Sequence, residues 1–447
     1  MAVIGASSNP DKLGNAILAN LIQGGFPGAI YPVNPRESEI LGLPVIPDVS
    51  HLPDGIDLAV VVVPAGAVAG VLRAAASKGA RAAIVISGGF REAGRTDLED
   101  GLKAVAAETG LRIVGPNCQG INYLPNRLCA SWPLLTARGP VAVISQSGTV
   151  AATLGGWASE EGFGVSALIS LGNQIDVSES ELLEFFAGDP NTRAIAMYLE
   201  GAHDGRQFLQ TLQRVIPQKP VVVLKSGCTV HGQRAASSHT RSLAGRDEVF
   251  EGLCRQFGLY RAGSIESLYD SAKAMATLPA CPGKRVMVVT SSGGSGILAV
   301  DQADRLGLEI PALPAAAAAE LKTVDIPANA TLSNPLDLTV ATAVQYQNAL
   351  DVLQKYDLAD YFLLIFGDPI PGAAEAALRA RDRGGAGIVA AYLGGGEVEK
   401  TERYKMHSLG IPVFPTPERA VQAIHAAEWS ARFRRLHAEP PRDPSVF

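Results

Sequence analysis

Residues Ala2-Val3-Ile4-Gly5-Ala6-Ser7-Ser8 join a short apolar run to a turn of glycine and serine, and a helical pattern follows. The same order of strand, small-residue turn and helix recurs at Val143-Ile144-Ser145-Gln146-Ser147-Gly148 and at Val289-Thr290-Ser291-Ser292-Gly293-Gly294-Ser295-Gly296. Each turn brings backbone N–H groups to a helix N-terminus, which favours phosphate, although tight packing alone also selects small residues there. The three turns therefore predict strand–helix units with candidate anion sites.

Further apolar runs alternate with helical patterns along the chain. They are apolar on both faces, which is typical of strands buried inside doubly wound parallel sheets. Strands are predicted over residues 2–5, 29–33, 58–63, 82–86, 112–114, 141–145, 165–170, 194–198, 221–224, 286–290, 361–366, 387–392 and 412–414. Helices are predicted over residues 14–23, 66–78, 98–108, 150–161, 247–257 and 315–321, a loop over 331–339 and a disordered tail over 440–447.

The composition limits the classes of protein that fit. The 447 residues include 38 basic and 44 acidic ones, and 47% are hydrophobic, as expected for a globular α/β protein. A mildly acidic chain without a basic stretch is not expected to bind nucleic acid or an anionic membrane. No apolar run reaches the about 18 residues of a membrane span, and residues 1–30 lack a signal-peptide pattern. The five cysteines form no CxxC pair, which predicts reduced thiols, no metal site and a cytoplasmic location.

The first turn is nucleotide-like but lacks the GxGxxG pattern of dinucleotide-binding domains. The second predicted strand ends in Val33-Asn34-Pro35-Arg36, without the acidic residue that would hold ribose hydroxyls. Arg36 suits a 2′- or 3′-phosphate instead. Both NADP and coenzyme A, which carries a 3′-phospho-ADP group, fit this observation.

Two residues are candidates for catalysis. His239 lies in a long segment of small polar residues, and an imidazole is a competent nucleophile near neutral pH. Glu200 follows a predicted strand, at the edge where parallel sheets bind ligands, and its carboxylate could fix the tautomer of an imidazole. A surface histidine in a flexible loop and a helix-capping glutamate are the simpler interpretations.

A series of short motifs runs in order along nearly the whole chain. They are Val3-Ile4-Gly5-Ala6-Ser7, Tyr31-Pro32-Val33-Asn34-Pro35, Val62-Val63-Pro64-Ala65, Ser87-Gly88-Gly89-Phe90, Gly115-Pro116-Asn117-Cys118, Ser145-Gln146-Ser147-Gly148, Leu171-Gly172-Asn173, Tyr198-Leu199-Glu200-Gly201, Ser237-Ser238-His239-Thr240 with Ser242-Leu243-Ala244-Gly245, and Asn334-Pro335-Leu336-Asp337. In this order and spacing they resemble the NDP-forming acyl-CoA synthetases, specifically the α subunits of ADP-forming acetyl-CoA synthetases and, more distantly, of succinyl-CoA synthetase.

The resemblance implies an architecture and a reaction. It implies a Rossmann-like CoA-binding domain over residues 1–125, then two flavodoxin-like, succinyl-CoA synthetase-like domains over 126–282 and 283–430, and a tail over 431–447. In such enzymes acyl-CoA, phosphate and ADP are interconverted with a carboxylic acid, CoA and ATP. The reaction passes through an acyl phosphate and a phosphohistidine.

The resemblance also assigns residues to roles. His239 would carry the phosphoryl group, and Glu200 would orient it. Residues expected to bind CoA are Gly5, Ser7, Ser8, Lys12, Asn34, Pro35, Arg36, Val63, Pro64 and Ser87. Residues expected to bind phosphate or acyl phosphate are Asn117, Ser145, Ser147, Gly148, Ser291, Gly293 and Gly294.

The sequence departs from the family pattern at several points. Arg241 follows the His-Thr pair where glycine is usual, Cys228 replaces a residue that is often basic, and some N-terminal residues are absent. No ATP-grasp domain is found, so the resemblance implies a separate ATP-grasp β subunit that holds ADP or ATP with Mg, in a hetero-oligomer, with a homodimer as the alternative. A noncatalytic CoA-binding regulator or scaffold is the second hypothesis, and an NADP-dependent oxidoreductase is a third and weaker one.

Overall fold

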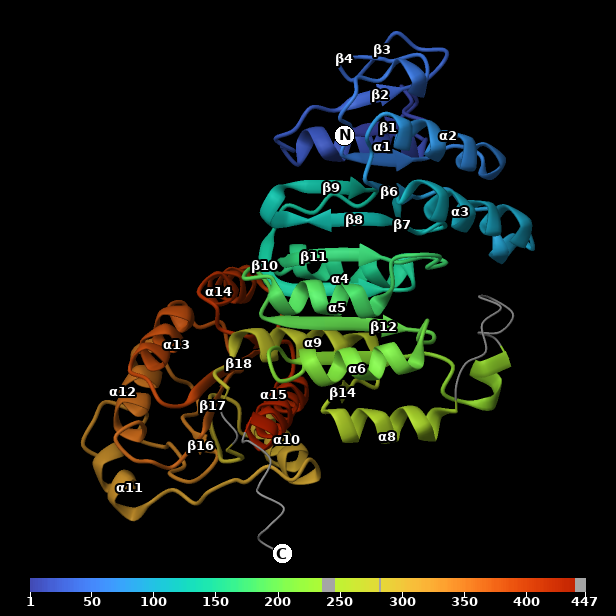
Figure 1. Cartoon of the computed structure of the whole chain (residues 1–447). Helices are drawn as coiled ribbons and strands as arrows, with labels where there is room; N and C mark the ends of the chain where they lie inside the picture. The colour runs from blue at the N-terminus through green and yellow to red at the C-terminus, as the bar shows by residue number, and fades with distance from the viewer. Residues whose placement is uncertain (235–245, 281–282, 439–447) are drawn as a thin grey trace, which may run out of the picture. The chain divides into compact units, whose positions relative to one another are not determined.

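The computed structural model describes residues 1–234, 246–280 and 283–438 (Figure 1). The chain forms two compact units. The first contains Met1–Glu160, Gly164–Lys219 and Val223–Phe257, and the second contains Glu161–Phe163, Pro220–Val222 and the chain from Gly258 onward. The division into three domains with ends at 125, 282 and 430 stays a prediction.

The first sheet of unit 1 is parallel, with the order β2-β1-β5-β6-β7. Its strands are β1 (Ala2–Ile4), β2 (Tyr31–Val33), β5 (Leu58–Val61), β6 (Ala82–Val85) and β7 (Arg112–Val114). Around it lie α1 (Leu13–Gln23), α2 (Ala65–Ser77), α3 (Thr96–Thr109), the hairpin β3 (Glu39–Ile40) and β4 (Leu43–Pro44), and the short helices η1 (Val49–His51) and η2 (Arg91–Ala93).

Alternating side chains of this sheet enter two separate cores. On β5, Ala59 and Val61 pack with Leu72 of α2, whereas Val60 packs with Leu18 of α1 on the opposite face. Each strand therefore buries both of its faces, which is why its sequence is a continuous apolar run. The predicted parallel α/β fold is confirmed for this part of the chain.

Within the described residues of unit 1, the second sheet has six strands, in the order β13-β12-β10-β11-β8-β9. Its strands are β8 (Gly120–Tyr123), β9 (Leu128–Ser131), β10 (Arg138–Ser145), β11 (Val165–Ser170), β12 (Ala194–Leu199) and β13 (Val221–Lys225). The accompanying helices are η3 (Leu124–Asn126), α4 (Gly148–Glu160), α5 (Glu179–Gly188), α6 (Gly205–Val215) and α8 (Asp247–Phe257).

The β8–β9 hairpin was not predicted from the sequence. It runs antiparallel to β11 and contains buried polar residues such as Asn122 and Ser131, so it shows no apolar run. The Asn20 amide of α1 donates to the carbonyl oxygen of Ser131 at 2.9 Å, which ties the first domain to the hairpin. Polar contacts of this kind leave no periodic signal in the sequence.

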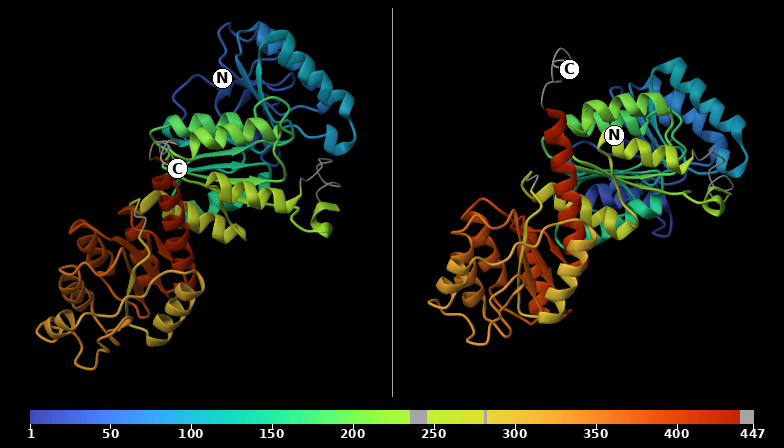
Figure 2. Two further views of the ribbon diagram at one scale, coloured as in Figure 1. Left: turned by 60° about the horizontal axis from the view of Figure 1, so that its bottom comes forward. Right: turned by 90° about the horizontal axis from the view of Figure 1, so that it is seen from below.

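Unit 2 contains a parallel sheet with the order β16-β15-β17-β18-β19. The elements of unit 2 are β14 (Tyr260–Arg261), α9 (Ile265–Thr277), β15 (Val286–Thr290), α10 (Gly293–Arg305), α11 (Ala315–Leu321), β16 (Leu336–Asp337), α12 (Ala343–Leu353), β17 (Tyr361–Phe366), α13 (Ala373–Asp382), β18 (Gly387–Tyr392), α14 (Glu397–Ser408), β19 (Val413–Phe414) and α15 (Pro417–Ala438). Figure 2 shows α15, in red, lying along this sheet.

Two predictions for this unit are wrong in detail. The segment predicted as a loop over residues 331–339 contains β16, because the fully buried Leu336 pairs with β15. The predicted tail from residue 431 begins inside α15, which continues to Ala438 because its apolar residues pack on α9 and α10. Residues 440–447, predicted to be disordered, lie outside the described residues. In the described part of the chain, no helix has the length and apolar character needed to cross a membrane.

Candidate functional site

The turn after β1 is shaped by two close backbone contacts. Gly5 has φ +92°, and a Cβ atom on it would lie 2.3 Å from the carbonyl oxygen of Val62. A Cβ atom on Gly14 of α1 would lie 2.1 Å from the carbonyl oxygen of Gly5. The Asn34 amide donates to the carbonyl oxygen of Ala6 at 2.7 Å and so joins the end of β2 to this turn. Only glycine permits this approach of helix to turn.

The predicted CoA-binding residues surround this turn. The hydroxyl of Ser7 accepts a hydrogen bond from the backbone N–H of Asn9 at 3.2 Å, and the hydroxyl of Ser87 donates to the carbonyl oxygen of Val63 at 2.6 Å. Val63, Pro64 and Ser87 follow β5 and β6 at the same edge of the sheet. Ser8, Lys12, Pro35 and Arg36 are exposed. The edge thus presents two cations beside backbone N–H groups.

Glu37 was missed by the sequence analysis and occupies this turn. Its carboxylate accepts from the backbone N–H of Ser8 at 2.9 and 3.2 Å. Hydrogen bonds from the Ser8 hydroxyl and N–H, with a smaller contribution from the charge of Lys12, hold the pKa of Glu37 below its ordinary value. An acidic residue therefore does follow β2, but it lies four positions beyond the end of the strand, and it binds an N–H group suited to phosphate.

The second sheet changes the direction of its strand order at β10. β11 lies on one side of β10 and β12 on the other, so the carboxyl end of β10 is a topological switch point, where open α/β sheets bind ligands. The segment after β7, which contains Pro116 and Asn117, contacts the loop after β11 near this switch point. The N–H of Asn173 donates to the carbonyl oxygen of Pro116 at 2.8 Å, and the Asn117 amide donates to Asn173 at 3.3 Å.

Ser145 and Ser147 shape the turn into α4. The fully buried Ser145 hydroxyl donates to the carbonyl oxygen of Ser147 at 2.6 Å and accepts from its N–H at 3.1 Å. The hydroxyl of Ser147 accepts from the N–H of Val150 at 3.4 Å. Ser145 is thus engaged inside the turn, and α4 begins directly after it at Gly148 with its positive N-terminal end.

Gln146 connects this turn to Glu200. Its side-chain oxygen accepts from the N–H groups of Glu200 and Gly201 at 2.5 and 3.2 Å. Its nitrogen donates to the carbonyl oxygen of Gly201 at 2.7 Å and to the side-chain oxygen of Gln174 at 2.9 Å. Gln174 in turn donates to the fully buried Glu179. The backbone that carries Glu200 is therefore held from two neighbouring loops.

A cavity of about 380 Å³ opens at this point. It is lined by Arg91, Glu92, Lys103, Gln146, Gly172, Asn173, Gln174, Glu200, Gly201, Ala202 and His203. Burial by itself would raise the pKa of Glu92, but hydrogen bonds from Asn173 and from the N–H groups of Phe90 and Gly89 outweigh it, so the pKa lies below its ordinary value. Glu92 thus remains an anion that holds Asn173 and the backbone at Gly89 and Phe90 in the lining of the cavity. Glu200 lines the same cavity.

Several predicted residues lie elsewhere. His239 and Arg241 fall outside the described residues. Ser291, Gly293 and Gly294 belong to unit 2, where a Cβ atom on Gly293 would lie 2.6 Å from a carboxylate oxygen of Asp337. Asn117, Ser147 and Gly148 lie in the connections near the switch point of unit 1, but they are not among the residues that line the cavity with Glu200. Within the described ranges, no group of three or more His, Cys, Asp or Glu residues could hold a metal ion.

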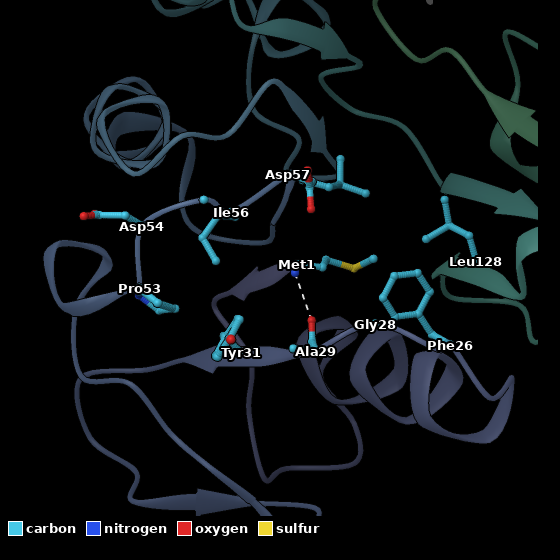
Figure 3. A pocket seen from close by; sticks show the side chains of 12 residues that line it. Met1, Phe26, Gly28, Ala29, Tyr31, Pro53, Asp54, Ile56, Asp57 and Leu128 are labelled. Atoms are coloured by element: carbon cyan, nitrogen blue, oxygen red, sulfur yellow. Dashed lines mark hydrogen bonds between the residues drawn. The ribbon is translucent and has the colours of Figure 1, made fainter.

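A second cavity, of about 270 Å³, lies at the opposite edge of the first sheet (Figure 3). It is lined by residues at the amino ends of β1, β2 and β5, including Met1, Tyr31 and Leu58, together with Asp54 and Asp57. No residue predicted to act in binding or catalysis lines it. Because parallel sheets bind ligands at their carboxyl ends, the first cavity is the candidate site.

Comparisons with known proteins identify the family of the chain. The family model of a CoA binding domain matches residues 1–123, and that of the succinyl-CoA ligase like flavodoxin domain matches residues 138–275. The chain is 39% identical to acetate–CoA ligase [ADP-forming] I subunit alpha of Pyrococcus furiosus, over 98% of this chain and 97% of the relative. It is 35% identical to the corresponding subunit of ligase II from the same organism, over 97% and 96%.

A solved structure gives the same result. Dinucleotide forming acetyl-coenzyme A synthetase 1 of Ca. Korarchaeum cryptofilum, in complex with phosphate and ADP, superposes with a TM-score of 0.90 at 36% identity, over 99% of this chain and 98% of that one. Fold, motifs and full-length similarity converge: this chain belongs to the family of α subunits of ADP-forming acetyl-CoA synthetases, which are acid–thiol ligases.

Proposed function

We propose that this chain is the α subunit of an ADP-forming acyl-CoA synthetase that acts on acetate or another small carboxylic acid through a phosphohistidine at His239. The observation that carries the proposal is the position of Glu200. It lies on the 380 Å³ cavity, and its backbone is fixed by Gln146, which lies in the turn into α4. A carboxylate whose backbone is fixed from the turn into a helix suits the orientation of an imidazole that exchanges a phosphoryl group.

The proposed reaction assigns a task to each part of the site. Phosphate attacks the thioester carbonyl, the C–S bond breaks, and CoA leaves as a thiolate that takes up a proton. The His239 nitrogen then attacks the phosphorus of the acyl phosphate, and the carboxylate leaves. Ser147, Gly148 and Asn117 would bind the phosphoryl group, and Glu200 would hold the second imidazole nitrogen. Positioning and charge neutralisation account for most catalysis of such transfers.

CoA would occupy the carboxyl edge of the first sheet. Lys12 and Arg36 are exposed cations beside the N–H groups of the turn after β1 and would neutralise its phosphates. Pro35, Val63, Pro64 and Ser87 line the same edge. This placement fits the match of residues 1–123 to a CoA binding domain.

The proposal requires a partner for the nucleotide. The Pyrococcus relatives are named as alpha subunits, and this chain spans 61% of the length of acetate–CoA ligase [ADP-forming] I of Archaeoglobus fulgidus. We therefore assign ADP, ATP and Mg to a separate ATP-grasp β subunit in a hetero-oligomer. The proposal includes a cytoplasmic location, in keeping with the free thiols of Cys118 and Cys129.

The decisive experiment is phosphoryl labelling of the chain with its β subunit. Labelled ATP should modify wild-type protein in an acid-labile, base-stable bond, and His239→Asn should abolish both label and turnover while CoA binding persists. His231→Asn, an exposed histidine eight positions earlier, is the matched control and should be labelled normally. Turnover by the His239→Asn protein would exclude the phosphohistidine.

A further inference from the structure

Gln119 carries a buried amide without a partner. It lies in the connection from β7 to β8, and only 3% of the residue is exposed. Its backbone N–H donates to the hydroxyl of Ser170 at 3.1 Å, but neither the oxygen nor the nitrogen of its side chain has a hydrogen-bond partner among the described residues. Burial of an unpaired amide costs folding free energy, so a buried amide usually has a partner in the protein, in an ordered water or in a ligand.

The amide lies at the N-terminus of α4. A Cβ atom on Gly148 would be 3.2 Å from the Gln119 Cβ atom and 3.5 Å from its side-chain oxygen, so the side chain touches the first turn of the helix. Ser147 is half-buried and Thr149 is exposed, which leaves this helix end accessible to a solute. The first N–H groups of a helix lack partners within the helix and attract anions. Two independent features therefore point to one small site.

The chemistry of the two features defines the ligand. The helix end suits an anionic phosphoryl group, and the neutral amide suits an uncharged oxygen beside it. An acyl phosphate carries both, because its carbonyl oxygen is one atom removed from the ester oxygen of the phosphoryl group. We infer that the Gln119 amide donates a hydrogen bond to the acyl oxygen of the acyl phosphate and so distinguishes an acyl phosphate from inorganic phosphate. This inference rests on the proposed function and identifies a residue that recognises the acyl group of the intermediate.

The test uses Gln119→Met, which keeps the volume of the side chain and removes its hydrogen-bonding atoms. Binding of acetyl phosphate and of inorganic phosphate to the full chain is measured by calorimetry. We expect the variant to lose about five- to tenfold in affinity for acetyl phosphate, as for one neutral hydrogen bond, and to keep its affinity for inorganic phosphate. In the complex with the β subunit, the KM for the acid should rise by a similar factor while the KM for CoA stays constant.

Gln347→Met is the matched control, since Gln347 is also buried and has an unpaired side-chain oxygen but lies in unit 2. It should change neither affinity. The melting temperature of Gln119→Met without ligand should be equal to or above that of wild type, because an unpaired amide has been removed. Equal affinities for acetyl phosphate in wild type and Gln119→Met, or a parallel loss for both ligands with a lower melting temperature, would overturn the inference.

Failure of the proposed function gives a different result. If the wild-type complex ligates no acid but the chain still prefers acetyl phosphate over phosphate in a manner that depends on Gln119, the assignment of Gln119 stands and the ligase reaction does not. If the complex is an active ligase and Gln119→Met binds and reacts as wild type does, the ligase stands and Gln119 has no part in acid recognition.

Discussion

Replacement of Gln146 by methionine tests whether Glu200 is positioned by its neighbours. The Gln146 side chain makes four hydrogen bonds, three of them to the backbone of Glu200 and Gly201. Methionine has a similar volume but cannot form them. The Gln146→Met variant therefore leaves the turn filled and releases the backbone of Glu200.

The magnitude follows from these contacts. At about 1 kcal/mol for each bond, the four bonds set an upper limit of about 4 kcal/mol on the loss of unfolding free energy. The half-buried position lets water replace part of this, so a loss of about 2 kcal/mol is expected. The effect on catalysis should be larger in proportion, because a shift of about 1 Å in a catalytic group costs about 100-fold in rate. We expect kcat to fall about 100-fold while the KM for CoA is unchanged, because the turn after β1 is untouched.

Steady-state kinetics of the complex and thermal unfolding of the chain measure the two effects. Gln218→Met is the matched control, since this exposed glutamine makes a single bond to the carbonyl oxygen of Arg214 and should leave kcat unchanged. Gln146→Glu keeps an acceptor for the N–H groups of Glu200 and Gly201 and should recover part of the rate. A Gln146→Met enzyme with the kcat of wild type would show that the position of Glu200 does not limit turnover.

Three further predictions concern the first domain. Glu37→Gln removes a negative charge from the N–H groups of the turn after β1, so it should tighten CoA binding severalfold in calorimetry. Glu39→Gln, on the exposed side of β3, is the control and should leave CoA binding unchanged. Weaker CoA binding by Glu37→Gln would show that the carboxylate supports the ligand. Gly14→Ala should lower the unfolding free energy by about 1–3 kcal/mol through overpacking. Gly66→Ala is the control, because a Cβ atom there meets nothing within 4 Å. Equal melting temperatures for wild type and Gly14→Ala would refute the close contact. The lowered pKa of Glu92 means that its carboxylate stabilises the fold above the ordinary value of 4.5, and that this contribution is lost as the pH falls through the lowered value. The difference in unfolding free energy between wild type and Glu92→Gln should therefore narrow in acid, and a constant difference from pH 7 to pH 3 would contradict this.

The central strands could be predicted because their sequences record burial on both faces. The runs at β11, β15, β17 and β18 were predicted with the bounds that the structure shows, since all residues of those strands are buried. The hairpin β8–β9 could not be predicted in this way. Its buried Asn122 and Ser131 bond to each other at 2.8 Å, so a polar pair replaces the apolar pattern that marks a strand.

The candidate site could be predicted only where its residues stand at the ends of secondary-structure elements. Glu200 and Gly148 could be placed because strand ends and helix starts follow from local patterns. The partners that decide their chemistry could not, because they are distant in sequence: Gln146 and Glu200 are separated by 54 positions, and Ser8 and Glu37 by 29. A glutamine or glutamate in a turn is usually exposed to solvent, and its sequence neighbours do not show whether its side chain instead bonds to a distant part of the chain.

The contrast between Gln146 and Gln119 separates the tasks of the site. Gln146 uses both ends of its amide within the protein, so the place of Glu200 is set before any substrate arrives. Gln119 uses neither end, although it is more deeply buried. A preorganised group needs no reorganisation during reaction, whereas an unpaired group gains free energy only when a ligand completes it. Gln146, in the turn into α4, therefore fixes the backbone of the proposed catalytic residue Glu200 in advance, whereas Gln119, beside the start of α4, would keep its hydrogen-bonding capacity for the acyl phosphate.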